Sequence, residues 1–164
     1  MSFAAACVCM PSSWDPAHAV GKTLHEVHES VPRLNPQIGE KIDRFLRQLQ
    51  PGKAYRRENW GFTRSAELNY HPALGRERLD STVSIDELFL RVEQQLFTGI
   101  PGGVLMGIRI RVCPVADLAA DPQVWRAVYD KIRTMPDDVA AYKGMLTARE
   151  AMLSEMARYS PVVG

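Results

Sequence analysis

The sequence is poor in cysteine and has no long hydrophobic run. Its three cysteines are an odd number, which fits no disulfide framework and is typical of a reducing cytosol. The stretch near the start without a charged residue, Ser2 to Trp14, is far too short to span a bilayer. No basic leader precedes it, so it is a poor signal peptide. We therefore expect a cytoplasmic protein that does not enter the membrane.

An excess of either charge is also missing. Lys and Arg number 20, Asp and Glu number 19, and the net charge is +1, so no overall field attracts nucleic acid or an anionic membrane. With 46% hydrophobic and 24% charged residues and no internal repeat, the composition is typical of a globular protein. We expect a single domain over residues 1–164. A P-loop, a dinucleotide fingerprint and a nucleophile elbow are absent, which leaves phosphate and acyl chemistry without a sequence motif.

Four segments have the pattern of β-strands. An apolar run at residues 3–10 predicts a buried strand, and the aromatic segment 53–62 predicts a second. Segments 87–97 and 103–112 flank a turn with two glycines and a proline, which predicts an antiparallel hairpin. Apolar residues alternate cleanly in the last segment, whereas 87–97 also fits a helix. The short loop between the two favours the strand.

Helices are predicted on either side of these strands. A short helical turn is expected over residues 22–29, and Asn35, an N-cap residue followed by proline, predicts the start of an amphipathic helix that runs to Leu49. From residue 115 to about 158 the chain is expected to be helical, and Thr147 opens the last helix with a capping-box pattern. The sum is an α+β fold: an antiparallel sheet, flanking helices and a helical C-terminal segment.

Histidines are the first candidates for a site. His25 and His28 share one short helical turn, where spacing puts His28 on the apolar face and lets His25 project to the side. His28 either makes a structural hydrogen bond or binds a metal through one nitrogen while an acceptor holds the other. His18 and His71 lie in expected loops. Spacing alone leaves both interpretations of His28 open.

The cysteines are poor candidates for a metal site. Cys7 and Cys9 alternate along the first expected strand, so their thiols share a face, but no second pair completes a tetrahedral zinc set. Cys113 is distant in the sequence and is followed by proline. We interpret all three cysteines as small buried hydrophobic residues.

Polar side chains interrupt both strands of the expected hairpin. Arg91, Glu93 and Gln95 share one face of the first strand, and Arg109 and Arg111 share one face of the second. Pairing of the strands would bring a carboxylate and several guanidinium groups together on one side of the sheet. That side is either a solvated face with weak ion pairs or the floor of a pocket that binds carboxylates.

Six segments occur in an order that resembles a known family. They are CMPSSW, LHEVHESVP, RRENWGFT, LFLRVEQQLF, GIRIRVCPV and AYKGM, and they extend from about Ala6 to about Met156. No segment is specific alone. Together and in this order they resemble the haem-dependent oxidative N-demethylase alpha-subunit-like family.

The resemblance implies a PAS-like fold that binds a b-type haem. It also implies an enzyme, a haem-dependent monooxygenase that removes a methyl group from a small secondary amine such as dimethylamine and releases formaldehyde. The reaction would use O2 and electrons from a flavin or iron–sulfur reductase partner, and the chain could form an oligomer. The alternatives are a PAS-like module that binds haem or another small ligand without turnover, and a structural subunit that binds no ligand.

The resemblance also implies roles for particular residues around the iron. His28, within VHESVP, is expected to be the proximal ligand, and His25 or His71 would take this role if His28 does not. Glu93, within RVEQQ, is the expected catalytic residue. It would attract a protonated amine or relay protons to bound oxygen, which requires a poorly hydrated pocket close to the iron.

Four further residues are expected to contact the haem. Arg91 and Arg109 would pair with its propionates, because the guanidinium fork matches a carboxylate. Trp60 and Phe62, in the segment ENWGFT, would line the cavity.

Overall fold

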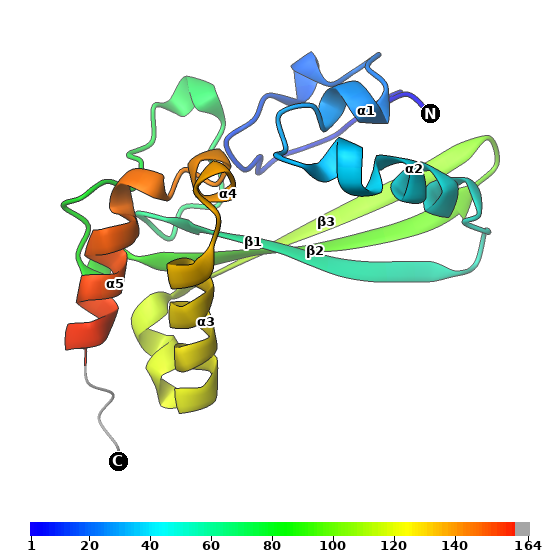
Figure 1. Ribbon diagram of the computed structural model, residues 1–164. Coiled ribbons are helices and arrows are strands. Elements are labelled where there is room, and N and C mark those ends of the chain that lie inside the picture. The colour runs from blue at the N-terminus through cyan, green and yellow to red at the C-terminus, as the bar shows by residue number, and fades with distance from the viewer. Residues whose placement is uncertain (160–164) are drawn as a thin grey trace. The chain divides into compact units, whose positions relative to one another are not determined.

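The structure, a computed structural model, describes residues 1–159. Within these residues, three strands form one antiparallel sheet in the order β1-β2-β3 (Figure 1). The strands are β1 (Ala54–Thr63), β2 (Phe89–Ile100) and β3 (Gly103–Pro114). The α-helices are α1 (Leu24–Val27), α2 (Leu34–Arg47), α3 (Pro122–Thr134), α4 (Asp137–Tyr142) and α5 (Arg149–Arg158). The predicted α+β class with flanking helices is confirmed, and the helical alternative for the segment around β2 is wrong.

A two-residue turn sets the register of β2 and β3. Pro101 fixes its first position, and Gly102, with φ 79°, has the positive φ that the next position of a type II turn requires. Ile100 therefore lies opposite Gly103. Further along the same pair, the N–H of Val115 donates to the carbonyl of Leu88 over 2.8 Å, as this register requires.

The described residues divide into two compact units. The first unit contains Met1–Asn59, Leu68–Gly75 and Val92–Arg111. The second contains Trp60–Glu67, Arg76–Arg91 and the chain from Val112 onward. Each strand of the sheet contributes residues to both units. Nowhere in residues 1–159 is there a helix whose length and apolar character would let it cross a membrane.

In the first unit, α1 packs against α2. A capping box begins α1: the Thr23 hydroxyl accepts a bond from the Glu26 N–H (3.3 Å), and the Glu26 carboxylate accepts one from the Thr23 N–H (2.7 Å). The expected cap of α2 at Asn35 is wrong. The helix begins at Leu34, and the Asn35 amide instead donates to the carbonyl of His25 over 2.9 Å.

The C-terminal end of α2 lies against the sheet of the first unit. Phe45 meets Tyr55 of β1 edge to face, with ring centroids 5.2 Å apart. On β2, Gly99 approaches the chain just after α2 so closely that a Cβ at this position would lie 2.5 Å from the carbonyl oxygen of Leu49. Only glycine fits this contact without movement of the backbone.

The second unit contains the main hydrophobic core. α3 and α5 pack together there. The buried members of the core are Phe62, Leu79, Val83, Leu88, Val115, Ile132, Met145, Ala148, Met152 and Met156. On α3, Ile132 is fully buried, whereas Val124 is exposed.

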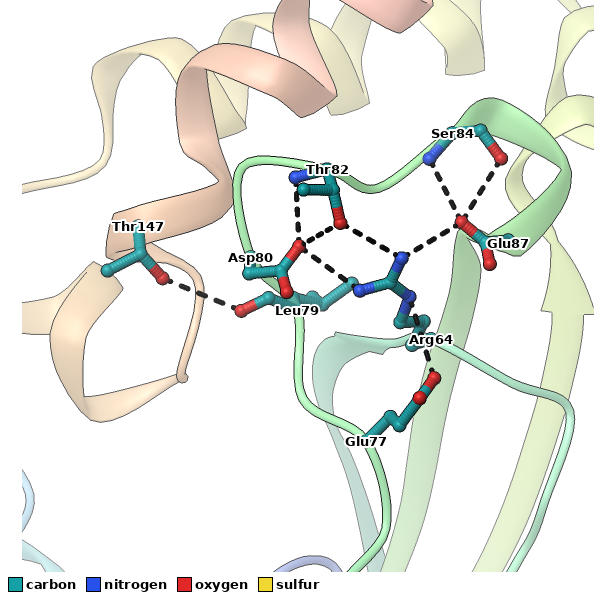
Figure 2. A network of polar contacts seen from close by, with 8 residues as sticks. All are labelled: Arg64, Glu77, Leu79, Asp80, Thr82, Ser84, Glu87 and Thr147. Atoms are coloured by element: carbon teal, nitrogen blue, oxygen red, sulfur yellow. Dashed lines mark hydrogen bonds and ion pairs between the residues drawn. The ribbon is translucent and has the colours of Figure 1, made fainter.

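A partly buried arginine organises the loop of the second unit before β2 (Figure 2). Arg64 donates from Nη1 to Asp80 (3.1 Å) and from Nη2 to the Thr82 hydroxyl (3.1 Å) and Glu87 (3.2 Å). Its Nε lies 3.8 Å from a carboxylate oxygen of Glu77. The hydrogen bond from Arg64 is the main cause of a lowered pKa of Glu87. The network holds the loop against the residue that follows β1.

Two further sequence predictions are wrong. Residues 3–10 form no strand, and the only ladder near the N-terminus is a bridge between Ser2 and Thr23. The capping box at Thr147 does not form either. α5 begins at Arg149 after Ala148, while the Thr147 hydroxyl donates to the carbonyl of Leu79 over 3.5 Å (Figure 2).

Candidate functional site

Glu93 is the centre of a polar cluster in the first unit. It is half-buried on β2, and three neutral groups donate hydrogen bonds to its carboxylate. The Ser12 hydroxyl donates to Oε1, while the amides of Asn59 (3.3 Å) and Gln95 (3.1 Å) donate to Oε2. Within the described residues, no Lys, Arg or His forms an ion pair with Glu93. None of the groups that donate to this carboxylate is therefore cationic.

Three different segments position these donors. Gln95 lies on the same face of β2 as Glu93 because side chains alternate along a strand, and Asn59 comes from the neighbouring strand β1. Ser12 lies in the N-terminal loop between two backbone bonds to Tyr70: the Tyr70 N–H donates to the carbonyl of Pro11 (3.0 Å), and the Ser13 N–H donates to the carbonyl of Tyr70 (3.2 Å). The Ser12 hydroxyl is thus fixed by backbone contacts.

His28, also in the first unit, is the residue that follows α1. Its ring is half-buried, as the helical spacing predicted, whereas His25 is exposed. Burial, and then the positive charge of Arg57, lower the pKa of His28 below its ordinary value. Neither ring nitrogen has a hydrogen-bond partner among residues 1–159. The shift favours the neutral form of the ring, and no side chain or backbone group of the described chain holds its nitrogens by a hydrogen bond.

The other histidines of the first unit are less suited to hold a ligand. The Nδ1 of His71 accepts the N–H of Ala73 over 3.1 Å, and its Nε2 lies 3.6 Å from a carboxylate oxygen of Asp15. Both nitrogens of His71 are thus engaged. The side chain of His18 is 83% exposed and lies 3.5 Å from Asp15.

Arg91, in the second unit, is buried, with 4% of its surface exposed. Its Nη1 donates to the backbone carbonyl of Glu67 over 3.4 Å. Arg91 therefore does not lie on a solvated face of the sheet. The predicted role of Arg91 toward a haem propionate stays a prediction.

Trp60 and Phe62 belong to the core of the second unit. Phe62 is buried in it, and Trp60 packs against it and meets the Phe62 ring edge to face at 5.8 Å between centroids. Lys143, which follows α4, donates to the Trp60 carbonyl, and its ammonium lies 5.1 Å from the centroid of the indole. These contacts explain both aromatic residues as core. Their predicted role in lining a haem cavity stays a prediction.

Arg109 and Arg111 do not join Glu93. The register of the hairpin sets Gln94 opposite Arg109 and Val92 opposite Arg111, on the face of the first unit that does not carry Glu93. The Gln94 amide donates to Glu58 on that same face, over 3.4 Å. The predicted gathering of these arginines with the carboxylate is therefore wrong. The alternation of side chains correctly predicted which residues share a face within each strand. The turn sets the register, however, and so decides which face of β2 adjoins which face of β3.

The prediction that all cysteines are buried is also wrong. Cys7 and Cys9 are exposed, and Cys113 is partly buried, which raises the pKa of its thiol. An apolar run rich in alanine and cysteine offers little side-chain surface to bury, and no neighbouring strand covers it.

The chain also matches a family of known proteins. The family is described as haem-dependent oxidative N-demethylase, alpha subunit-like, and the match covers residues 1–153. The chain belongs to this family. The resemblance inferred from the six sequence segments is thus confirmed over nearly the whole sequence.

One side chain of this family member is suited to be an axial ligand of a haem. Within residues 1–159, no three His, Cys, Asp or Glu side chains gather into a group able to hold a metal ion. A porphyrin provides four nitrogens itself and needs from the protein an axial ligand such as a neutral imidazole. His28 is such an imidazole, half-buried and without a hydrogen-bond partner in the described chain.

Sequence reasoning missed one partner of the site in this family member. No sequence pattern distinguishes Ser12, although it lies in CMPSSW, one of the segments that carry the resemblance. It is 81 residues away from Glu93 along the chain, and a serine in a loop gives no periodic signal of its direction. The only indication of a role for Ser12 in the sequence is that it lies in a segment that carries the family resemblance.

Proposed function

We propose that the chain is a haem-dependent oxidative N-demethylase subunit with a PAS-like fold, a b-type haem and a small secondary amine such as dimethylamine as substrate. The family match over residues 1–153 is the observation that carries this proposal. The family description gives only a likeness to the alpha subunit of such enzymes. The amine substrate, the reductase partner and the type of haem are part of our proposal.

His28 is the proposed axial ligand. A ligating imidazole must be neutral, and burial together with Arg57 favours the neutral form of this ring. The capping box at the start of α1 and the bond from the His28 N–H to the carbonyl of Leu24 (3.1 Å) fix the backbone that carries it. Because the ring itself has no partner in the described chain, ligation breaks no hydrogen bond there.

Glu93 is the proposed catalytic residue. Its charge attracts a protonated secondary amine, and its fixed oxygens can hold a proton at one position. Ser12, Asn59 and Gln95 restrict the carboxylate to one orientation, so less side-chain freedom is lost when a substrate binds.

The proposed reaction balances as follows. Dimethylamine, O2, two electrons and two protons give methylamine, formaldehyde and water, and the electrons come from a reductase partner. Haem, when bound, supplies the redox chemistry of this conversion. The chain supplies the axial imidazole, the site for the ammonium group and a route for protons.

Haem titration of the purified chain tests the ligand. We expect a Soret band after reconstitution, and we expect His28→Ala to shift or abolish it. His25→Ala is the matched control, because His25 is exposed and only three residues away in the same segment, and it should leave the band unchanged. An unchanged band in His28→Ala would remove His28 from the ligand role.

Turnover tests the activity separately. With haem, dimethylamine, O2 and a surrogate electron donor, formaldehyde should be released, and Glu93→Gln should lower this rate by about 100-fold while keeping the Soret band. Haem binding without formaldehyde release from the native chain would favour a haem-binding module over an enzyme. No band at all would contradict both.

A further inference from the structure

The edge strand β3 leaves apolar residues exposed on both of its faces in the first unit. Leu105 is 57% exposed, Met106 39% and Ile108 37%. All five residues from 105 to 109 are exposed. An exposed apolar edge of this length is uncommon, because it invites pairing with another chain.

The backbone of β3 also has groups directed to the open side. In an antiparallel pair, opposite residues alternate between pairs that exchange both backbone bonds and pairs that exchange none. Ile100 and Gly103 form the first bonded pair after the turn, so every second residue from Gly103 bonds to β2. The N–H and carbonyl groups of Met106, Ile108 and Ile110 therefore point away from β2, where the described sheet has no further strand.

The opposite edge of the sheet differs in its chemistry. On β1 in the first unit, Arg56, Arg57 and Glu58 are exposed one after another, so charge lies on both faces. Charges on an edge oppose strand pairing. The β3 edge has no such protection between residues 103 and 108. Strand addition is thus expected at β3 and not at β1.

Two arginines give the β3 edge a positive charge. Arg109 and Arg111 are exposed on one face, and neither has an ion pair or a hydrogen bond from its side chain among residues 1–159. No acidic residue occurs between positions 98 and 116. A partner with carboxylates on the same face would meet both guanidinium groups.

We propose that the open edge of β3 binds an extended strand of an acidic partner protein. Apolar side chains of this strand cover Met106 and Ile108 on one face, and its carboxylates meet Arg109 and Arg111 on the other. Main-chain bonds to the edge supply affinity, and the alternating side chains supply specificity. The site uses Arg109, which the resemblance assigned to a haem propionate, but binding of the strand needs neither haem nor amine substrate, so its test is separate from that of the proposed function.

A second copy of this chain is a poorer occupant. Two copies of β3 would bring four unpaired guanidinium groups into one small area, where like charges repel. Sedimentation of the purified chain is therefore expected to give a monomer, and a dimer that Arg109→Glu leaves intact would contradict the proposal.

Designed peptides test the edge directly. We use a fluorescein-labelled peptide of about nine residues in which valine and glutamate alternate, sized to the exposed part of the strand. A second peptide carries lysine in place of glutamate. Fluorescence anisotropy with the full chain should show binding of the glutamate peptide, weakened by salt, and at least about tenfold weaker binding of the lysine peptide.

Charge-reversed variants provide the sharper result. Arg109→Glu combined with Arg111→Glu should exchange the preference, so that the lysine peptide binds better. Arg56→Glu on β1 makes a comparable change at a 69% exposed side chain and is the control that should keep the native preference. Equal binding of both peptides, or the same exchange in Arg56→Glu, would overturn the proposal.

A backbone variant separates edge pairing from simple charge attraction. In Ile108→Pro, proline removes an N–H that faces the open side and no bond to β2, so the sheet is expected to stay intact by circular dichroism. Binding of the glutamate peptide should fall by about tenfold or more. Full binding by this variant would show that the peptide does not pair with the edge.

Discussion

His28 and Glu93 are held in different ways. Three side chains from distant parts of the sequence fix the carboxylate of Glu93. The ring of His28 is restrained by burial, while only its backbone is hydrogen-bonded within the described chain. Hydrogen bonds thus fix the orientation of the Glu93 carboxylate, whereas none within the described chain fixes the imidazole of His28.

At this scale, Arg57→Gln is expected to raise the pKa of His28 toward its ordinary value. The charge of Arg57 opposes protonation of the ring, and burial, the larger cause, remains in the variant. A titration of the His28 ring protons by NMR measures the change. Arg56→Gln is the control, because its side chain points to the other face of β1, and it should leave the titration unchanged.

The lowered pKa of His28 also makes the stability of the folded chain depend on pH. Because folding lowers the pKa of His28, the unfolded chain takes up the proton first, so stability is lost as pH falls below the ordinary histidine pKa. Arg57→Gln should make this loss smaller. If the denaturation midpoints of both proteins fell equally as the pH is lowered, the effect of Arg57 on the pKa of His28 would be contradicted.

Sequence alone predicted these residues unevenly. Alternation put Glu93 and Gln95 on one face, and helical spacing separated His28 from His25, because both patterns depend only on neighbours along the chain. The bond from Ser12 to Glu93 and the separation of Arg109 from Glu93 depend on the loop path and on strand register. Neither leaves a periodic signal in the sequence.

At the scale of elements, periodicity was sufficient wherever a segment had both a pattern and a partner. β2 and β3 follow the predicted hairpin, and α2 follows the predicted amphipathic segment. Residues 3–10 are apolar but have no partner strand and make no strand of their own. Helix starts failed at Asn35 and Thr147, because each side chain bonds elsewhere. Such competition is invisible in the local sequence.

Gly99→Ala tests how closely α2 and β2 approach each other. Its Cβ would lie 2.5 Å from the oxygen and 2.8 Å from the carbon of the Leu49 carbonyl, so the backbone must move. We expect a loss of about 1–3 kcal/mol in the free energy of unfolding, measured with denaturant. Gly103→Ala, where nothing lies within 4 Å, is the control and should change it by less than about 0.5 kcal/mol. Equal effects would contradict the contact.

At the scale of the whole molecule, hydrophobic exposure is unevenly distributed. Among the large hydrophobic residues exposed in residues 1–159, only Val124, Tyr142 and Leu146 belong to the second unit, and the others belong to the first. The second unit contains the main hydrophobic core. Overall composition predicted a globular protein but gave no sign of this asymmetry, because it depends on which apolar residues find neighbours.

Ile132→Ala is expected to be among the costly substitutions of the chain. Its side chain is fully buried in the core of the second unit, so truncation leaves a cavity and should cost about 2–5 kcal/mol of unfolding free energy. Val124→Ala on the same helix removes an exposed side chain and should cost less than about 0.5 kcal/mol. Urea denaturation measures both. A similar loss in the two variants would contradict the assigned core.

The sharing of every strand between both units has a consequence for proteolysis. Each unit is assembled from separate stretches of chain that alternate with those of the other. A protease that nicks the connection between β1 and β2 therefore releases no autonomous fragment. The two pieces should migrate together under native conditions and part only in denaturant, since neither carries a complete set of the strands it needs.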